Sequence, residues 1–258
     1  MRVLRKFGDI PTKPGTHSPE FMAHLENCAM VKGGIPPVTV ADPLHTHKFD
    51  QFYFVMSGVV DVQLGTDKVR AEPDTLVRIP AGLAHFALNE GVDPVVQMEI
   101  LLPAPVPASG GELIPIKELC TENDEPPPPN CLTQVRADKW MSMPDGKIEL
   151  QILANRASGS EHGMISVTRV APGTEPTQYG VHPFDEFYFV LDGELTVDLS
   201  GEVFTGGRHD LIVVPARTPY RAWNAGEQPE RHLTVVAPEP PSSMELSSWT
   251  VPVDFARQ

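Results

Sequence analysis

Residues 49–58 read FDQFYFVMSG, and residues 184–193 repeat them almost letter for letter as FDEFYFVLDG, 135 positions later. When that offset is held without a gap, residues 45–89 and 180–224 share 15 identical residues in 45 aligned positions. An identity of one third over an ungapped stretch is far above chance for unrelated segments. The chain therefore contains an internal duplication, and we expect two similar domains.

Within each copy the pattern is that of short β-strands. Residues 59–64 (VVDVQL) and 194–199 (ELTVDL) alternate apolar and polar side chains, which is typical of half-buried strands. Proline and glycine together supply 48 of the 258 residues, about 19%, well above ordinary usage. So many turn-forming residues favour short strands over long helices. We therefore predict an all-β sandwich or barrel in each half.

A proline-rich segment separates the two copies. Residues 118–130 read ELCTENDEPPPPN, a composition that makes a stiff and solvated linker. We predict an N-terminal barrel over residues 1–117, a linker over 118–139 and a C-terminal barrel over 140–258. The pattern differs at residues 12–30, where apolar residues recur at helical spacing and we expect a short helix or an irregular arm.

Charge and composition exclude several classes of partner. Aspartate and glutamate number 34 against 20 lysines and arginines, which gives a net charge of −14. This balance, without a basic patch, argues against binding nucleic acid. No stretch approaches 18 apolar residues, and the N-terminus lacks the apolar core of a signal peptide, so we expect no membrane span or secretion. Three cysteines without a CxxC pair favour a reducing, cytoplasmic location.

Three histidines form the strongest chemical signal. His45 and His47 are two residues apart, so on an extended strand both imidazoles point to the same face. Gln51 follows four residues later, and the segment PAGLAHFALN at residues 80–89 brings His85 from another strand. Three imidazoles and an amide oxygen could form a metal site, and imidazole suits zinc, iron, nickel, copper and manganese alike.

These residues resemble the two motifs of the cupin family, HxHxxxE-x6-G and PxGxxHxxxN. The matching positions of the first copy are His45, His47, Gln51, Gly58, Pro80, Gly82, His85 and Asn89. Only Gln51 departs from the pattern, since the family usually has glutamate there. With its duplicated half the chain resembles a bicupin. The resemblance implies two tandem double-stranded β-helix (jelly-roll) barrels with a metal in the barrel mouth.

Carried over by position, the resemblance implies that His45, His47, Gln51 and His85 bind one divalent transition metal. We favour Fe(II), with zinc, nickel or manganese as alternatives. Glutamine in place of glutamate leaves every ligand neutral. The ion then becomes a stronger Lewis acid, and a redox metal gains a higher potential.

The second copy departs further from the motifs. Gly180 stands at the position of His45 and Tyr220 at that of His85, so two of the four ligand positions are lost. His182 and Glu186 are retained. We expect His182, Glu186 and Tyr220 to form a hydrogen-bonded cluster in a barrel without metal.

Two further residues are candidates for catalysis. Tyr53 lies two positions after Gln51, so strand alternation can point it at the metal as a proton donor, although its repetition as Tyr188 equally suits a packing role. Residues 95–101 (VVQMEIL) place Gln97 and Glu99 on one face of a strand. If that face points inward, Glu99 is a candidate general base. Such residues more often lie on a solvated face.

Three classes of function follow, each with a small organic molecule as partner. The first is a metal-dependent dioxygenase, an oxidoreductase that cleaves a ring or a C–C bond. The second is a non-redox isomerase, lyase or cyclase, in which the metal polarises a carbonyl group. The third is a non-catalytic cupin that only binds a small molecule. We rank them in this order, with little between the first two, and we leave a homodimer open.

Overall fold

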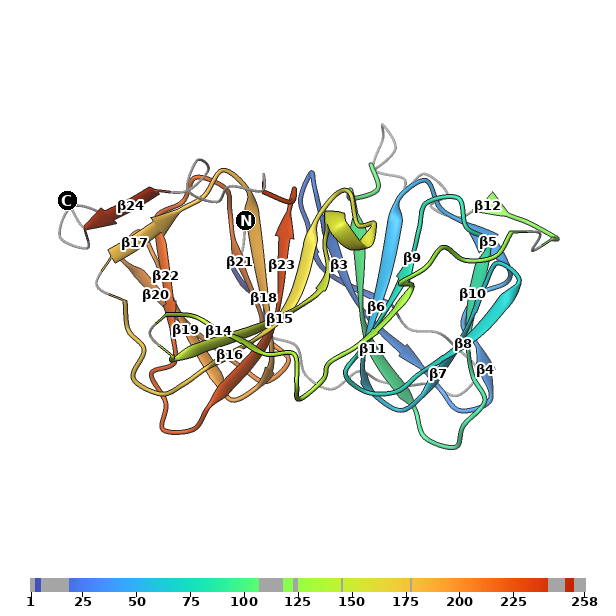
Figure 1. The fold of residues 1–258 in the computed structure, drawn as a ribbon, viewed down its shortest axis with the longest axis horizontal. Coiled ribbons are helices and arrows are strands. Elements are labelled where there is room, and N and C mark those ends of the chain that lie inside the picture. Colours follow the sequence, from blue (N-terminus) through green and yellow to red (C-terminus); the bar gives the residue numbers. More distant parts are fainter. Residues whose placement is uncertain are drawn as a thin grey trace. The chain divides into compact units, whose positions relative to one another are not determined.

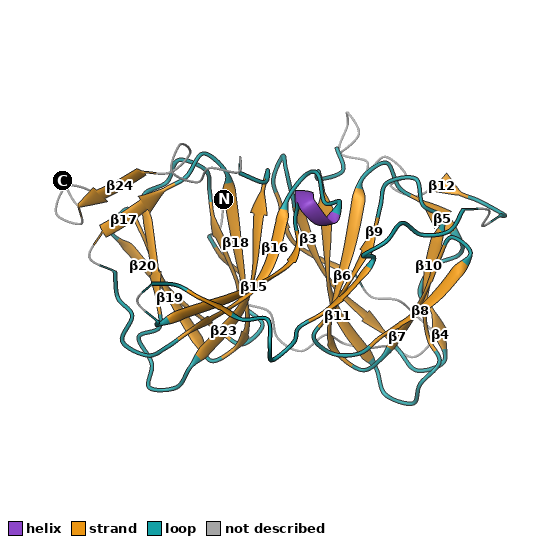
Figure 2. Ribbon diagram, in the orientation of Figure 1, coloured by secondary structure: helices purple, strands orange, loops and turns teal. Residues whose placement is uncertain are grey.

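The computed structural model describes residues 3–5, 19–106, 118–122, 125–144, 146–176, 178–240 and, for the backbone alone, 249–252. Nearly all regular elements in these ranges are strands, and the one helix among them is the single 3-10 turn η1 (Arg156–Ser158) (Figure 2). Within the same ranges no helix has the length and apolar character needed to cross a membrane. Contacts divide the chain into two compact units. One spans Asp9–Gln134, and the other takes in Met1–Gly8 and Val135–Gln258.

The first unit, called the first barrel below, consists of two antiparallel sheets (Figure 1). One sheet has the strand order β13 (Leu132–Gln134), β9 (Thr75–Ile79), β6 (Asp50–Ser57), β11 (Val95–Leu102), β3 (Ala29–Ile35) and β2 (Glu20–His24). The other has the order β12 (Glu118–Leu119), β5 (His45–Thr46), β10 (His85–Asn89), β7 (Val60–Leu64) and β8 (Asp67–Ala71), and β4 (Thr39–Val40) also pairs with β10.

The second unit, the second barrel, repeats this plan. Its larger sheet has the order β1 (Leu4–Arg5), β21 (Leu211–Val214), β18 (Asp185–Asp192), β23 (Glu230–Ala237), β16 (Met164–Val170), β15 (Ile148–Ala154) and β14 (Met141–Ser142). Its smaller sheet has the order β20 (Glu202–Gly207), β19 (Glu194–Leu199), β22 (Tyr220–Trp223), β17 (Gln178–Val181) and β24 (Trp249–Pro252). The prediction of two tandem all-β barrels is confirmed.

Each barrel buries an apolar core between its two sheets. In the first barrel, Tyr53 and Val55 of β6 pack with Val60, Val62 and Leu64 of β7, and all five are at most 4% exposed. These side chains alternate along their strands with residues that face the other way, as the period of a strand requires. The second barrel has the equivalent core, from Tyr188, Val190, Leu195, Val197 and Leu199.

The duplication extends to individual hydrogen bonds in the loops. Asn89 donates from Nδ2 to the carbonyl oxygens of Ile35 (3.0 Å) and Asp93 (2.8 Å), and its Oδ1 accepts from the amide of Gly91 (2.9 Å). Asn224 makes the same three bonds to residues that lie 135 positions further along the chain. Both side chains are buried. They pair with backbone groups in and beside a loop, and a buried backbone group needs such a partner.

One local prediction was wrong. The helix or irregular arm expected at residues 12–30 is, where the structure describes it, strand β2 paired with β3. Met22 is buried and Phe21 is 42% exposed, so neighbouring residues face opposite sides as in a strand. Pairing with the edge of β3 overrides a weak local preference for helix. Residues 12–18 lie outside the described ranges.

Candidate metal centre

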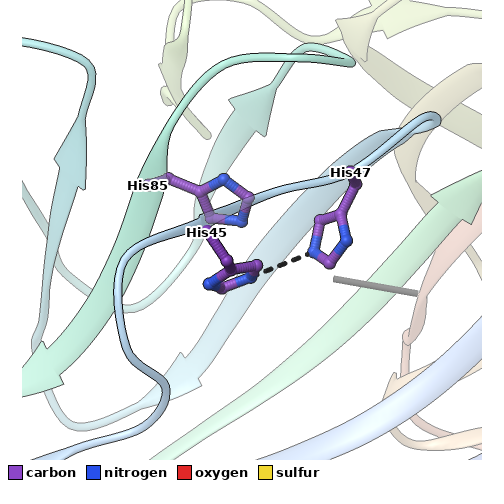
Figure 3. Close-up of side chains that lie close together, drawn as sticks. All are labelled: His45, His47 and His85. Carbon is purple, nitrogen blue, oxygen red and sulfur yellow. Dashed lines mark hydrogen bonds between the residues drawn. The ribbon is translucent and has the colours of Figure 1, made fainter. Parts of the chain in front are cut away.

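Three imidazoles meet in the interior of the first barrel (Figure 3). His45 lies on β5, His47 follows that strand, and His85 begins β10 directly opposite His45 in the antiparallel pair. One ring nitrogen from each histidine lies within 4.8 Å of the other two. All three side chains are at most 4% exposed. Among the described residues, these three histidines are the cluster of histidine, cysteine or acidic side chains that lie close enough together to hold a metal ion.

Backbone carbonyl groups orient two of the rings. Nδ1 of His45 lies 2.7 Å from the carbonyl oxygen of Pro43, and Nδ1 of His85 lies 2.9 Å from that of Leu83. A carbonyl oxygen only accepts hydrogen bonds, so each Nδ1 carries a proton, and a ring that is neutral then presents the lone pair of Nε2. Nε2 of His45 in turn lies 3.2 Å from Nε2 of His47. The Nε2 atoms of His45 and His85 therefore point into the centre of the cluster.

His47 is held in a different way. Its ring stacks on Phe49, with 4.6 Å between the ring centroids and 17° between the planes. His182 and Phe184 repeat this stack in the second barrel at 4.8 Å and 16°. The two phenylalanines are identical in the repeat, but the motif pattern gave no sign that they position the histidine before them. The carbonyl partners of His45 and His85 were missed as well, because every residue has a backbone carbonyl group and the sequence does not show which one is used.

Gln51 turns its amide oxygen toward the histidines. Its Nε2 donates to Oε2 of Glu99 at 3.0 Å, which fixes Oε1 on the opposite side, 3.1 Å from Nε2 of His85. With the proton of His85 on Nδ1, two acceptors face each other at that distance, an arrangement that a bound cation relieves. Three imidazole nitrogens and one amide oxygen are donors that divalent transition metals accept. The residues present thus fit the metal that the motifs imply.

Glu99 points into the barrel, and the expectation that it more often lies on a solvated face was wrong. In the register of β11 against β6, Glu99 is opposite Tyr53 and Leu101 is opposite Gln51, so Glu99 shares the inward face. Its carboxylate is 7% exposed and accepts hydrogen bonds from Gln51 (3.0 Å) and from Nε2 of Gln97 (3.1 Å). Both faces of β11 are buried, so its alternation of polar and apolar residues does not mark a solvent side.

Tyr53 completes the inward face. Its hydroxyl donates to Oε1 of Gln51 at 3.4 Å, a long bond, and the side chain is 4% exposed. Burial, reinforced by the negative charges of Glu99 and Asp42, raises the pKa of Tyr53 well above the usual range of tyrosine. The phenol therefore stays protonated at neutral pH and acts as a hydrogen-bond donor. The structure brings all six predicted site residues together: His45, His47, Gln51, Tyr53, His85 and Glu99.

The corresponding place in the second barrel holds a different cluster. The hydroxyl of Tyr220 donates to Oε2 of Glu186 at 2.8 Å, and the hydroxyl of Tyr188 donates to the same oxygen. Nε2 of His182 lies 3.8 Å from Oε1 of Glu186. The structure thus groups the three residues expected there and adds Tyr188. Gly180, opposite Tyr220 in the strand pair, contributes no side chain.

Comparison with known proteins gives relatives of two kinds. A segment of 86 residues is 31% identical to the polyketide synthase CurC of Streptomyces cyaneus, and covers 32% of this chain and 55% of that protein. Another of 91 residues is 28% identical to the tetracenomycin polyketide synthase protein TcmJ of Streptomyces glaucescens, with coverages of 35% and 60%. The chain thus spans little more than half the length of these curated relatives.

Solved structures match over most of the chain. A cupin 2 conserved barrel domain protein from Leptotrichia buccalis aligns with a TM-score of 0.62 at 14% identity, over 88% of this chain and 92% of that one. The oxalate decarboxylase of Bacillus subtilis aligns with a TM-score of 0.64 at 15% identity, over 90% and 74%. At such identities the likeness concerns the fold alone. The model of the Cupin_2 family, the cupin domain, matches residues 33–101 and again 166–236, together more than half of the chain. The protein therefore belongs to the cupin family, with one cupin domain in each half.

Proposed function

We propose that the first barrel is a metal-dependent, non-redox active site that moves a proton on a small enolisable carbonyl compound, as an isomerase, lyase or cyclase does. The observation that carries this proposal is the inward position of Glu99, beside Tyr53 and the amide of Gln51. A proton acceptor and a proton donor next to a metal site are the groups that enolisation needs. The position of Glu99 is our reason for proposing this class instead of the dioxygenase that the sequence favoured.

Each side chain has a distinct task in this scheme. His45, His47, His85 and Gln51 would hold one divalent ion, which supplies Lewis acidity to a carbonyl oxygen. Glu99 accepts the proton from the carbon beside that carbonyl, and its burial keeps water from competing for it. Tyr53, which stays protonated, donates a hydrogen bond to the substrate oxygen or returns a proton to it.

The curated relatives support the class of substrate. Both are described as polyketide synthase proteins. Polyketide chains carry carbonyl groups on alternate carbons, and the C–H bonds between two carbonyls are acidic. A Lewis acid beside a carboxylate suits that chemistry. Zinc or manganese would serve this reaction, since no change of oxidation state is required.

A dioxygenase is the second candidate, and it is favoured by a separate observation. All four donors that face the centre are neutral, and the carboxylate of Glu99 lies behind Gln51 instead of among them. A neutral set raises the potential of a redox metal relative to one with a carboxylate ligand. Under this alternative the metal is Fe(II), and substrate loss is coupled to the consumption of oxygen.

One experiment separates the two. The protein is purified without added metal, its metal content is measured, and it is loaded with Zn, Mn or Fe(II) under anaerobic conditions. Exchange of the α-protons of α-tetralone in D₂O is then followed by NMR, because the α-protons of a monoketone exchange slowly without a catalyst. We expect metal-dependent exchange without oxygen, reduced at least about tenfold in Tyr53→Phe and in Glu99→Gln. Absence of anaerobic exchange together with oxygen uptake by the iron form would reject this proposal in favour of the dioxygenase.

Matched variants locate the metal. His85→Ala removes an imidazole from the first barrel, and we expect it to lose the metal and the exchange activity together. Tyr220→Phe changes the corresponding position of the second barrel and should leave one equivalent of metal in place. Two equivalents in the wild-type protein, or equal loss in both variants, would contradict a single site in the first barrel.

A further inference from the structure

The second barrel has an open cavity of about 610 Å³ between its two sheets. That volume is within the range of sites that bind small organic molecules. Alternate residues of the larger sheet line one side, among them Leu150, Ile152, Met164 and Val236, and residues of β19 and β22 line the other. The walls are largely apolar. Polar side chains also line the cavity away from Glu186, Tyr188 and Tyr220, namely Ser166, Thr168, Gln178, Arg221, His232, Thr234 and Glu239.

At one end of β18 the carboxylate of Glu186 lines the cavity. Oε2 accepts hydrogen bonds from the hydroxyls of Tyr188 and Tyr220, whereas Oε1 has His182 at 3.8 Å, beyond hydrogen-bond distance. Burial and the charge of Glu186 raise the pKa of both tyrosines well above the usual range, so both remain donors at neutral pH. Glu186 lines the cavity and can accept a further hydrogen bond from a bound molecule at Oε1.

Replacement of the first metal-ligand position by glycine contributes to this space. At the positions of His45 and His85 in the first barrel, the second barrel has Gly180 and Tyr220, and both line the cavity. A Cβ atom built on Gly180 would meet Nε2 of His182 at 3.4 Å, so an imidazole at this position would project toward the space that glycine leaves open. Where the first barrel has two imidazoles, the second thus has open space at Gly180 and a hydroxyl of Tyr220 that donates to Glu186.

The chemistry of the walls selects the class of ligand. An aliphatic chamber of this size favours an apolar ring system. A carboxylate in the ligand would be repelled by Glu186, and the one arginine among the described lining residues, Arg221, is already paired with Glu175 and Asp198. An ammonium group would have to give up its hydrating water. Its partner at Glu186 would be a carboxylate that already accepts hydrogen bonds from two tyrosines, so the cost of desolvation exceeds the gain. A neutral hydroxyl group loses little on entering and completes the hydrogen bonds of Glu186.

We propose that the second barrel is a metal-free binding site for a neutral, hydroxylated aromatic or alicyclic molecule, whose ring lies against the aliphatic walls and whose hydroxyl donates to Glu186. This site is separate from the metal centre, and the proposal does not depend on the reaction proposed for the first barrel.

Calorimetry with four probes tests the proposal on the full-length protein: β-naphthol, its methyl ether, β-naphthoate and naphthylmethylammonium. We expect β-naphthol to bind at least about tenfold more tightly than the other three, since only it is neutral and donates a hydrogen bond. The same affinity is expected in His85→Ala, which disables the metal centre. Loss of binding in His85→Ala would place the probe in the first barrel and overturn the proposal, as would tighter binding of the acid or of the amine, or no binding of β-naphthol.

Two variants locate the site. Ser166 is in the middle of the cavity wall, opposite Thr234, so Ser166→Leu fills the space and should abolish binding of β-naphthol. Val203→Leu on β20 is 53% exposed and serves as the matched control that keeps wild-type affinity. In Glu186→Leu the preference for β-naphthol over its methyl ether should disappear. Thermal unfolding verifies that each variant is folded, and unchanged affinity in folded Ser166→Leu would refute the location.

Discussion

Glu99 offers the sharpest test of the metal centre, because two substitutions there separate charge from hydrogen bonding. In Glu99→Gln the new carbonyl oxygen can still accept from Nε2 of Gln51. The new amide group would face Nε2 of Gln97, but Oε1 of Gln97 is buried and has no hydrogen-bond partner among the described residues. A flip of the Gln97 amide therefore restores the second bond, so this variant removes the negative charge and little else. Glu99→Leu removes both acceptors.

The expected magnitudes follow from these contacts. Loss of a group that orients a metal ligand typically lowers metal affinity by 10- to 100-fold. We expect Glu99→Gln near the lower value, about tenfold, because Gln51 keeps its orientation. Glu99→Leu should reach about 100-fold, since Gln51 is released. It should also lower the free energy of unfolding by about 1–3 kcal/mol, because Nε2 of Gln51 is left buried without a partner.

The assay is competition for zinc against a chromophoric chelator, with urea unfolding of the metal-free protein in parallel. Glu230→Gln is the matched control, because Glu230 is also a fully buried carboxylate on a central strand, paired with His232 in the second barrel. Its zinc affinity should equal that of the wild type. Wild-type affinity in both Glu99 variants would refute the role of Glu99 behind the metal ligand. Equal losses in the two variants would refute the flip of Gln97.

Three further predictions concern stability. Gly58→Ala should lower the free energy of unfolding, measured with urea, by about 3 kcal/mol or more, because φ is +74° and a Cβ would lie 2.5 Å from a backbone oxygen. Gly82→Ala should lower it by only about 1–2 kcal/mol, because φ is +83° but no atom lies within 4 Å of the added Cβ. Equal losses in the two variants would contradict the steric argument. Asn89→Ala removes three hydrogen bonds and should cost about 1.5–4 kcal/mol in the same assay, and a loss below 1 kcal/mol would show that the loop is held otherwise. In a titration followed by tyrosine absorbance, Tyr53, Tyr188 and Tyr220 should ionise only as the protein unfolds, because the pKa of each is raised in the folded protein. These three tyrosines contribute stability below a pH of about 10, and that stability is lost as the pH rises further. Ionisation of all four tyrosines in the folded protein would contradict this.

Much of the candidate metal centre could be predicted from the sequence because its spacing is local. His45 and His47 share a face through strand alternation alone, and the repeat predicted a second barrel with fewer ligands. The orientation of Glu99 was not accessible, since it depends on whether both faces of β11 are buried, and pairing with β3 and β6 decides that. The tautomers of His45 and His85 likewise depend on carbonyl groups that any residue could supply.

The cavity of the second barrel is a further example. The sequence identified Gly180 and Tyr220 as lost ligands, but it could not tell whether neighbouring side chains close over the space. The repetition of Tyr53 as Tyr188 suited a packing role and a proton donor equally, and Tyr188 both packs in the core and donates its hydroxyl to Glu186. Volume is a property of many side chains from different strands, and it follows only when all of them are placed together.

By itself, the sequence determined the duplication, the all-β class and the three histidines, because each is written in spacing along one or two strands. Only the tertiary structure decided which carboxylate lies behind Gln51 of the candidate metal centre and that the second barrel has a cavity lined by Glu186. The physical reason is that a strand's period fixes which residues share a face, whereas the pairing and packing of distant strands fix what that face meets.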